Sequence, residues 1–171
     1  MDRMSSIELA MMNEKKEMEF YGQNAKRSRN VLAKAMFETL ARDEAEHMAR
    51  IKGLHGKLVA AGSWPENVAI QVAGTDIRET LERLVRTDGA AEEHDDDDVK
   101  AIKAGIEFET KGEKLYAELA KACENVAERT FFAFLSGIER EHRLSLTDTL
   151  HYLEDPESWL TTHERGGLDG A

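Results

Sequence analysis

The stretch MFETLARDEAEH, residues 36–47, is the clearest indication of the fold in this sequence. It has the spacing of an amphipathic helix, but Glu44 and His47 interrupt its apolar face. These two residues are three apart, so they lie on one side of a helix. A carboxylate and an imidazole therefore point into the expected core. The apolar face that they interrupt is formed by Met36, Leu40, Ile51, Leu54 and Leu58.

The same pattern returns 95 residues later in FFAFLSGIEREH, residues 131–142. Glu139 follows Glu44, and His142 follows His47, by that same number of residues. One acidic residue on an apolar face is common, and it usually sits at the helix edge with its carboxylate in water. A repeat of the whole pattern is harder to explain in that way.

The shift of 95 residues also relates the segments upstream of each pair. NEKKEMEFYG, residues 13–22, overlays FETKGEKLYA, residues 108–117, and pairs Glu14 with Glu109 and Tyr21 with Tyr116. Each half is thus one helical hairpin, with a Glu on its first helix and Glu-x-x-His on its second. We therefore predict an all-α four-helix bundle of two duplicated hairpins.

Composition agrees with a single helical domain over 1–171. The charged fraction is 33%, and 12 Gly with 2 Pro are too few for a turn-rich β fold. The net charge of −11 argues against nucleic acid and anionic membranes as partners and favours a cation. No apolar run approaches the roughly 20 residues of a membrane span. The first residues also lack the apolar stretch of a signal peptide.

The only cysteine, Cys123, permits neither an internal disulfide nor a cysteine-rich metal site. We expect it to be a buried small residue on the third helix. This cysteine usage favours a reducing cytoplasm.

The two hairpins are expected at about 5–61 and 98–153. The first helix should start at Ser5 or Ser6, because Ser5 and Glu8 fit a capping box. The others are expected at about 31–61, 98–123 and 126–153, the last ended by Asp155-Pro156. The connection 62–97 is long enough to contain a short crossover helix at 75–85. The tail 154–171 should dock by Trp159 and Leu160 and then fray.

The acidic run 92–98 is most simply a solvated linker whose last aspartates favour the start of the third helix. A loose surface cation site at His94 is the alternative.

Four carboxylates brought together in a bundle interior need neutralisation, because unpaired buried charges are costly. No Lys or Arg lies in the central layer of these helix faces. Two divalent cations, with a charge of +4, would balance the four carboxylates, and two neutral imidazoles would complete the ligand set. Iron or manganese suits such ligands, while zinc would bind without redox chemistry. The predicted metal ligands are Glu14, Glu44, His47, Glu109, Glu139 and His142.

On these motifs the chain resembles the rubrerythrin branch of the ferritin-like di-iron proteins. The likeness covers about 5–60 and 98–153 and rests on residues 14–21, 44–47, 109–116 and 139–142. It implies a ferritin-like fold and two irons, with His47 and His142 on opposite irons. Which glutamates bridge the irons is left open.

The chain departs from this family in two respects. Rubrerythrins proper carry a rubredoxin-type domain held by four cysteines, which one cysteine cannot supply. The family also has an extra glutamate at the place of Gly112, where it takes part in a redox-linked ligand switch. The mirror position on the first helix is Glu17. Glu17 is either a fifth metal carboxylate or an edge residue paired with a lysine.

Further polar residues lie near the predicted ligands. Tyr21 and Tyr116 either donate hydrogen bonds to ligand carboxylates or are core tyrosines satisfied elsewhere. Asp43 either orients an imidazole or is unrelated to the site, since Ile138 stands at the matching place. The histidines without a counterpart in the other half are expected at the surface or at helix edges. They are His55, His151 and His163.

The resemblance implies an oxidoreductase that reduces hydrogen peroxide or dioxygen with electrons from an external donor, such as a rubredoxin-like protein. One alternative is a ferroxidase that binds and oxidises Fe²⁺, and another is a metal-free interaction module. The resemblance also implies a homodimer. The 62–97 connection is long enough to permit the exchange of hairpins between two chains.

Overall fold

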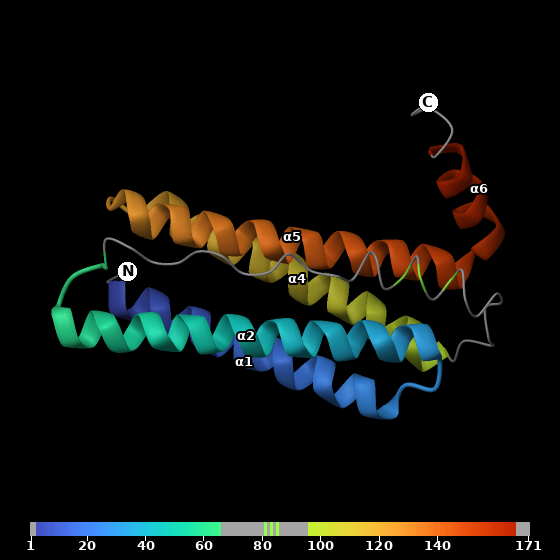
Figure 1. Ribbon diagram of the computed structural model, residues 1–171, viewed down its shortest axis with the longest axis horizontal. Coiled ribbons are helices and arrows are strands. Elements are labelled where there is room, and N and C mark those ends of the chain that lie inside the picture. The colour runs from blue at the N-terminus through green and yellow to red at the C-terminus, as the bar shows by residue number, and fades with distance from the viewer. Residues whose placement is uncertain (1–2, 66–80, 82, 84, 86–95, 167–171) are drawn as a thin grey trace.

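The structure is a computed structural model that describes residues 3–65, 81, 83, 85 and 96–166. Four long helices lie side by side, and a fifth turns away at one end of the bundle (Figure 1). The predicted four-helix bundle of two hairpins is confirmed. The helices whose bounds lie within the described residues are α1 (Arg3–Arg27), α2 (Val31–Ala61), α4 (Asp96–Ala122), α5 (Val126–Glu154) and α6 (Pro156–Gly166).

The turn of each hairpin ends in an asparagine that caps the next helix. The Asn30 side chain accepts a hydrogen bond from the Ala33 N–H at 3.0 Å, and Asn125 accepts one from the Glu128 N–H at 3.0 Å. Such caps satisfy backbone donors that a helix start leaves unpaired. The two asparagines are also 95 residues apart, so the duplication includes the turn that reverses each hairpin.

The core consists of two apolar clusters, one toward each end of the bundle. The first contains Tyr21, Phe37, Leu40, Ile102 and Leu146, and the second contains Ile7, Ile51, Tyr116, Phe132 and Leu135. Mirrored ring pairs occur in them, with Tyr21 on Phe37 at 6.2 Å and Tyr116 on Phe132 at 6.4 Å. The clusters therefore enclose the middle of the bundle from both ends.

Several helix boundaries differ from those predicted. Helix α1 begins at Arg3, so Ser5 lies inside the helix and the predicted capping box does not mark its start. Helix α4 begins two residues earlier than expected and ends at Ala122, which leaves Cys123 just beyond it. The Cys123 thiol is only partly buried and donates to the Leu119 carbonyl at 3.1 Å, so the prediction of a buried helical residue was wrong.

The tail forms helix α6, which continues to Gly166, past the docking residues after which fraying was expected; residues 167–171 lie outside the described residues. Asp155 Oδ1 accepts from the Ser158 N–H at 3.0 Å, and Pro156 takes the first helical position, where its missing N–H costs nothing. Asp155-Pro156 thus ends α5 and starts α6. Trp159 docks as predicted, since its Nε1 donates to Asp148 Oδ1 at 2.8 Å, but Leu160 is 41% exposed.

Most of the helix predicted at 75–85, in the connection between the hairpins, lies outside the described residues. His94 also lies outside them. Leu81, Arg83 and Val85 are described and helical. Leu81 is buried in the first apolar cluster, and Val85 packs against that cluster. No helix among the described residues is long and apolar enough to cross a membrane.

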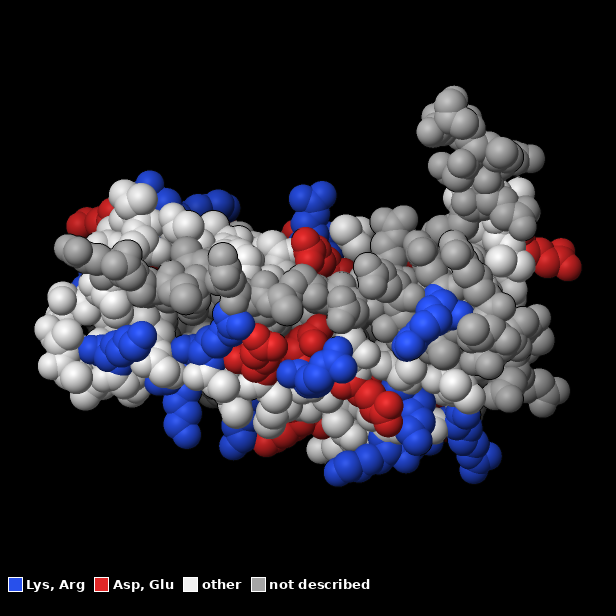
Figure 2. Space-filling view, in the orientation of Figure 1, with Lys and Arg blue, Asp and Glu red and all other residues white. Residues whose placement is uncertain are grey.

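The surface shows both signs of charge. Figure 2 shows Lys and Arg side chains interspersed with Asp and Glu over this face of the bundle. Part of the acidic excess lies inside the protein, because five glutamates are buried in its middle. They are Glu14, Glu17, Glu44, Glu109 and Glu139.

Candidate metal centre

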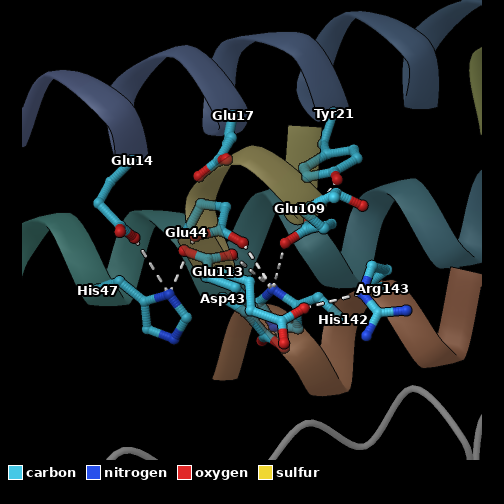
Figure 3. A network of polar contacts seen from close by, with 12 residues as sticks. Glu14, Glu17, Tyr21, Asp43, Glu44, His47, Glu109, Glu113, His142 and Arg143 are labelled. Atoms are coloured by element: carbon cyan, nitrogen blue, oxygen red, sulfur yellow. Dashed lines mark hydrogen bonds and ion pairs between the residues drawn. The ribbon is translucent and has the colours of Figure 1, made fainter. Parts of the chain in front are cut away.

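The structure brings all six predicted ligands together in the middle of the bundle. Figure 3 labels Glu14, Glu44, His47, Glu109 and His142. Their helical spacing turns each toward the bundle axis, and none is more than 1% exposed. Helix α1 carries Glu14 and α4 carries Glu109. The second helix of each hairpin carries two, namely Glu44 and His47 on α2 and Glu139 and His142 on α5.

Glu44 lies between the two imidazoles. Its Oε2 is 3.0 Å from His47 Nδ1, and its Oε1 is 2.9 Å from His142 Nδ1. The rings are nearly parallel, with centroids 5.6 Å apart. His47 Nδ1 is also 3.2 Å from Glu14, and His142 Nδ1 is 3.6 Å from Glu109. Each imidazole therefore presents Nδ1 to the carboxylates.

These donors form two compact groups that share Glu44. In each group, atoms able to bind a metal lie within 4.8 Å of one another. Carboxylate oxygens with one imidazole suit Fe²⁺ or Mn²⁺ and also accept Zn²⁺. The first group is Glu44, Glu109, Glu139 and His142, and the second is Glu14, Glu44 and His47.

Glu17 faces the same interior. It is fully buried, and its Oε2 accepts from Asn13 Nδ2 at 2.9 Å, a contact that the sequence did not suggest. Its Oε1 is buried without a hydrogen-bond partner among the described residues. A third group of candidate ligands joins Glu17 to Glu14, Glu44 and Glu139. The alternative of an edge residue paired with a lysine is wrong.

Gly112, the mirror position of Glu17, allows a close approach between helices. A Cβ placed on Gly112 would lie 3.1 Å from Glu139 Cδ, so the Glu139 side chain packs directly against α4. A larger residue there requires Glu139 to move. The fifth carboxylate of the cluster consequently comes from α1 alone.

Without cations, protons balance part of this charge. Burial, reinforced by Glu44, raises the pKa of Glu14 to about 8, and burial likewise raises the pKa of Glu17 and Glu139. Burial alone would raise the pKa of Glu44, but His142 and His47 bring it below its ordinary value. Burial opposes a charge on His47, yet Glu14 and Glu44 raise its pKa to about 9.

Many oxygen and nitrogen atoms of the cluster that could bind a metal have no hydrogen-bond partner among the described residues. Unpaired buried polar atoms are rare and costly, so their concentration here needs a specific explanation. Two divalent cations would satisfy these atoms and replace the protons. The residues present therefore fit a metal pair. The atoms without a hydrogen bond are Glu14 Oε2, Glu17 Oε1, Glu44 Oε1, Glu109 Oε2, Glu139 Oε2 and His142 Nδ1, although some of them lie within ion-pair distance of one another.

Two tyrosines support the carboxylates across the hairpin boundary. The Tyr21 hydroxyl on α1 donates to Glu109 on α4, and the Tyr116 hydroxyl on α4 donates to Glu14 on α1. Burial, with the nearby carboxylates, raises the pKa of both tyrosines, so both hydroxyls keep their protons and act as donors. The predicted hydrogen bonds to candidate ligands are confirmed.

The remaining polar candidates differ in their distance from the cluster. Asp43 Oδ2 is 3.7 Å from His142 Nε2. His55 is a partly exposed residue 3.8 Å from Glu8, and His151 is exposed, as predicted. The side chain of His163 lies outside the described residues.

A model of the rubrerythrin family matches residues 6–150, which include most of both hairpins and every candidate ligand. The chain belongs to the rubrerythrin family. Searches of curated proteins and of solved structures found no match. Rubrerythrins are ferritin-like di-iron oxidoreductases, and the buried glutamate and histidine cluster fits the di-iron centre of the family.

Proposed function

We propose that this rubrerythrin-family protein is a non-haem di-iron oxidoreductase that reduces hydrogen peroxide, or dioxygen, with electrons from an external donor. The observation that carries the proposal is the buried group of four carboxylates and two imidazoles, many of whose oxygen and nitrogen atoms have no hydrogen bond among the described residues. Two divalent cations balance the four carboxylates in charge. A structural role alone offers no reason to bury so many unpaired acids.

The contacts support one arrangement of ligands. Glu14 and His47 would hold one iron, and Glu109 and His142 the other. Glu44 contacts both imidazoles, and Glu139 belongs both to the group around His142 and to the group around Glu14. We therefore infer that these two glutamates would be shared by both ions.

Glu17 would add a fifth carboxylate to this arrangement. Five carboxylates exceed the charge of two Fe²⁺ ions by one, whereas oxidation adds positive charge. Glu17 therefore favours the oxidised state and increases the tendency of the reduced centre to give electrons to an oxidant.

When bound, the irons supply the two electrons that, with two protons, convert hydrogen peroxide into two water molecules. The protein holds the ligands in place and excludes bulk water. Tyr21 and Tyr116 fix the carboxylates of Glu109 and Glu14, and the two apolar clusters enclose the site from both ends. A dry site strengthens the interaction between these carboxylates and bound cations.

Anaerobic Fe²⁺ titration followed by rapid mixing with peroxide, and separately with dioxygen, tests this proposal. We expect two irons per chain, oxidation by one peroxide per two irons, and renewed reduction by an added donor such as a reduced rubredoxin-like protein. His142→Ala should lower iron binding, while the exposed His151→Ala serves as the matched control. A wild-type protein that binds no iron would refute the proposal.

The same titration separates this activity from ferroxidation, in which Fe²⁺ is the substrate. Oxidation that stops at two irons per chain supports the oxidoreductase. Continued oxidation of many irons per chain, without an electron donor, would indicate a ferroxidase instead.

The predicted homodimer is tested by sedimentation of the purified protein. In this structure the two hairpins of one chain together complete the ligand set, so the site does not itself require exchange of hairpins. A dimer with two irons per chain is expected, and localisation of a tagged protein tests the predicted cytoplasmic location.

A further inference from the structure

The two imidazoles of the candidate centre differ on their outer sides. Each presents Nδ1 to the carboxylates, so each Nε2 points away from them. His142 Nε2 faces Asp43 Oδ2 at 3.7 Å. Neither Nε2 has a hydrogen-bond partner among the residues that the structure describes, but of the two only His142 Nε2 has a carboxylate within ion-pair distance there.

Sequence explains this difference at one pair of positions. Asp43 directly precedes Glu44 on α2, and its counterpart before Glu139 on α5 is Ile138. Ile138 is 7% exposed and has no polar atom to offer an imidazole. The duplication therefore gives a carboxylate to the histidine of one hairpin only.

Asp43 is available for this contact. Its Oδ2 is buried without a hydrogen-bond partner among the described residues, and Arg42, whose side chain is 67% exposed, lies 3.6 Å from the other oxygen. Arg143, beside His142 in sequence, instead donates to Glu113 at 2.9 Å (Figure 3). The gap of 3.7 Å exceeds a hydrogen bond, but it lies within ion-pair reach.

A carboxylate behind a metal-binding histidine has a known physical effect. It accepts the outer N–H, fixes the tautomer and the ring orientation, and makes the metal-facing nitrogen a better donor. Metal binding at Nδ1 makes the Nε2–H a stronger donor, which favours closing the gap to Asp43. His47 gains none of this from the described residues, because its outer nitrogen meets no acceptor among them.

We propose that Asp43 is a positioning residue for His142 and that it makes the two metal positions unequal. The position at His142 fills first and holds its ion more tightly, and the position at His47 fills second. This inference rests on the proposed metal pair, but it does not depend on which oxidant the protein reduces.

Anaerobic titration of the metal-free protein with Co²⁺, followed by visible absorption, tests the inference without activity. We expect two binding steps, the first about 10–100-fold tighter than the second. Asp43→Leu should weaken the first step by about that factor and leave the second unchanged. Asp43→Asn keeps an acceptor and should recover part of the loss. Ile138→Asp, the mirror change, should tighten the second step.

A double-mutant comparison assigns the effect to His142. Asp43→Leu should weaken Co²⁺ binding in a His47→Ala background, where only the position at His142 keeps its imidazole. It should have no effect in a His142→Ala background. A merely structural role of Asp43 would lower both affinities alike. Thermal unfolding of each metal-free variant checks that it folds.

Two results would overturn the inference. One is an unchanged Co²⁺ titration in Asp43→Leu, and the other is an equal loss in both histidine backgrounds. Either result leaves the proposed oxidoreductase intact if two irons still bind and react with peroxide. Absence of metal binding in the wild-type protein would instead overturn the proposed function itself.

Discussion

The two hairpins are alike where they surround the candidate metal pair and differ at a few neighbouring positions. Paired residues include the glutamates, the histidines, the tyrosines that cross between hairpins, and the phenylalanines stacked on them. They differ at two pairs of corresponding positions, where Glu17 matches Gly112 and Asp43 matches Ile138. The repeated residues are those that would hold the proposed pair of ions, and the unmatched residues make the surroundings of its two positions different.

The sharpest test of this likeness compares a shared carboxylate with an unshared one. Glu44→Ala should weaken the binding of both ions by about 3 kcal/mol, which is about a hundredfold in Kd. The reason is that Glu44 contacts both imidazoles in a buried site. Glu14→Ala should weaken one ion only. Iron per chain after dialysis against a weak chelator measures the difference. Equal losses in the two variants would contradict the shared position of Glu44.

A second test compares the metal-free and metal-loaded protein over pH. Glu14 and His47 have raised pKa values, about 8 and 9, above their ordinary 4.5 and 6.5. The folded protein therefore binds more protons than the unfolded chain, and its stability falls as pH rises from about 5 to about 9. The lowered pKa of Glu44 matters only at lower pH, where its contribution is lost.

Bound cations should reverse this trend, because ligands must lose their protons to bind metal. At a free metal concentration a thousand times the Kd, the stabilisation is about 4 kcal/mol. Urea unfolding at several pH values, with and without Mn²⁺, measures both slopes. His151→Ala should leave them unchanged, whereas a metal-free protein that gains stability with rising pH would refute the protonation described above.

The crossed tyrosines provide a test of equivalence. Tyr21→Phe and Tyr116→Phe should each lower the free energy of unfolding of the metal-free protein by about 0.5–3 kcal/mol, since each removes a hydrogen-bond donor from a buried carboxyl group. Because the contacts mirror one another, we expect equal losses within about 0.5 kcal/mol. Urea unfolding of both variants checks this, and a large inequality would break the correspondence between the hairpins.

Gly112 provides a test of difference. Gly112→Ala should destabilise the protein by about 1 kcal/mol or more, because the new Cβ would lie 3.1 Å from Glu139 Cδ. Gly22→Ala is the matched control, since nothing lies within 4 Å of its Cβ and the residue 95 positions later is already Ala117. That control should stabilise α1 by about 0.5–1 kcal/mol. Thermal unfolding distinguishes the two signs.

The sequence predicted the bundle, the pairing of its halves and the members of the buried cluster because helical periodicity and an exact shift carry that information. Glu44 and Glu139 recur on equivalent helix faces, so neither could be exposed without exposing core residues. Phe37 and Phe132 are also related by that shift. An apolar residue on an apolar helix face, however, indicates only the core and no specific role.

Other features depended on distances that periodicity does not contain. The burial of Glu17 follows from how closely α1 approaches the other helices, and the approach of Asp43 to His142 spans two hairpins. At the tail, Asp155-Pro156 was recognised as the end of one helix but not as the start of the next. The end of α5 and the start of α6 are encoded by the same two residues. The start of α6 is seen only in the structure, where Asp155 accepts from the Ser158 N–H and Trp159 docks against Asp148.

The smallest effect concerns the turns, where the duplicated caps differ in one contact. Asn30→Ala and Asn125→Ala should each cost about 1 kcal/mol, because each removes an acceptor from a helix start.

The Asn30 turn has additional support, since its backbone N–H donates to the buried carboxylate of Asp98 at 3.2 Å. Asp98→Ala should therefore increase hydrogen exchange in the first turn of α2 and leave that of α5 unchanged, because an unsupported turn opens more readily. Faster exchange at both turns would mean that Asp98 stabilises the bundle as a whole and not this turn.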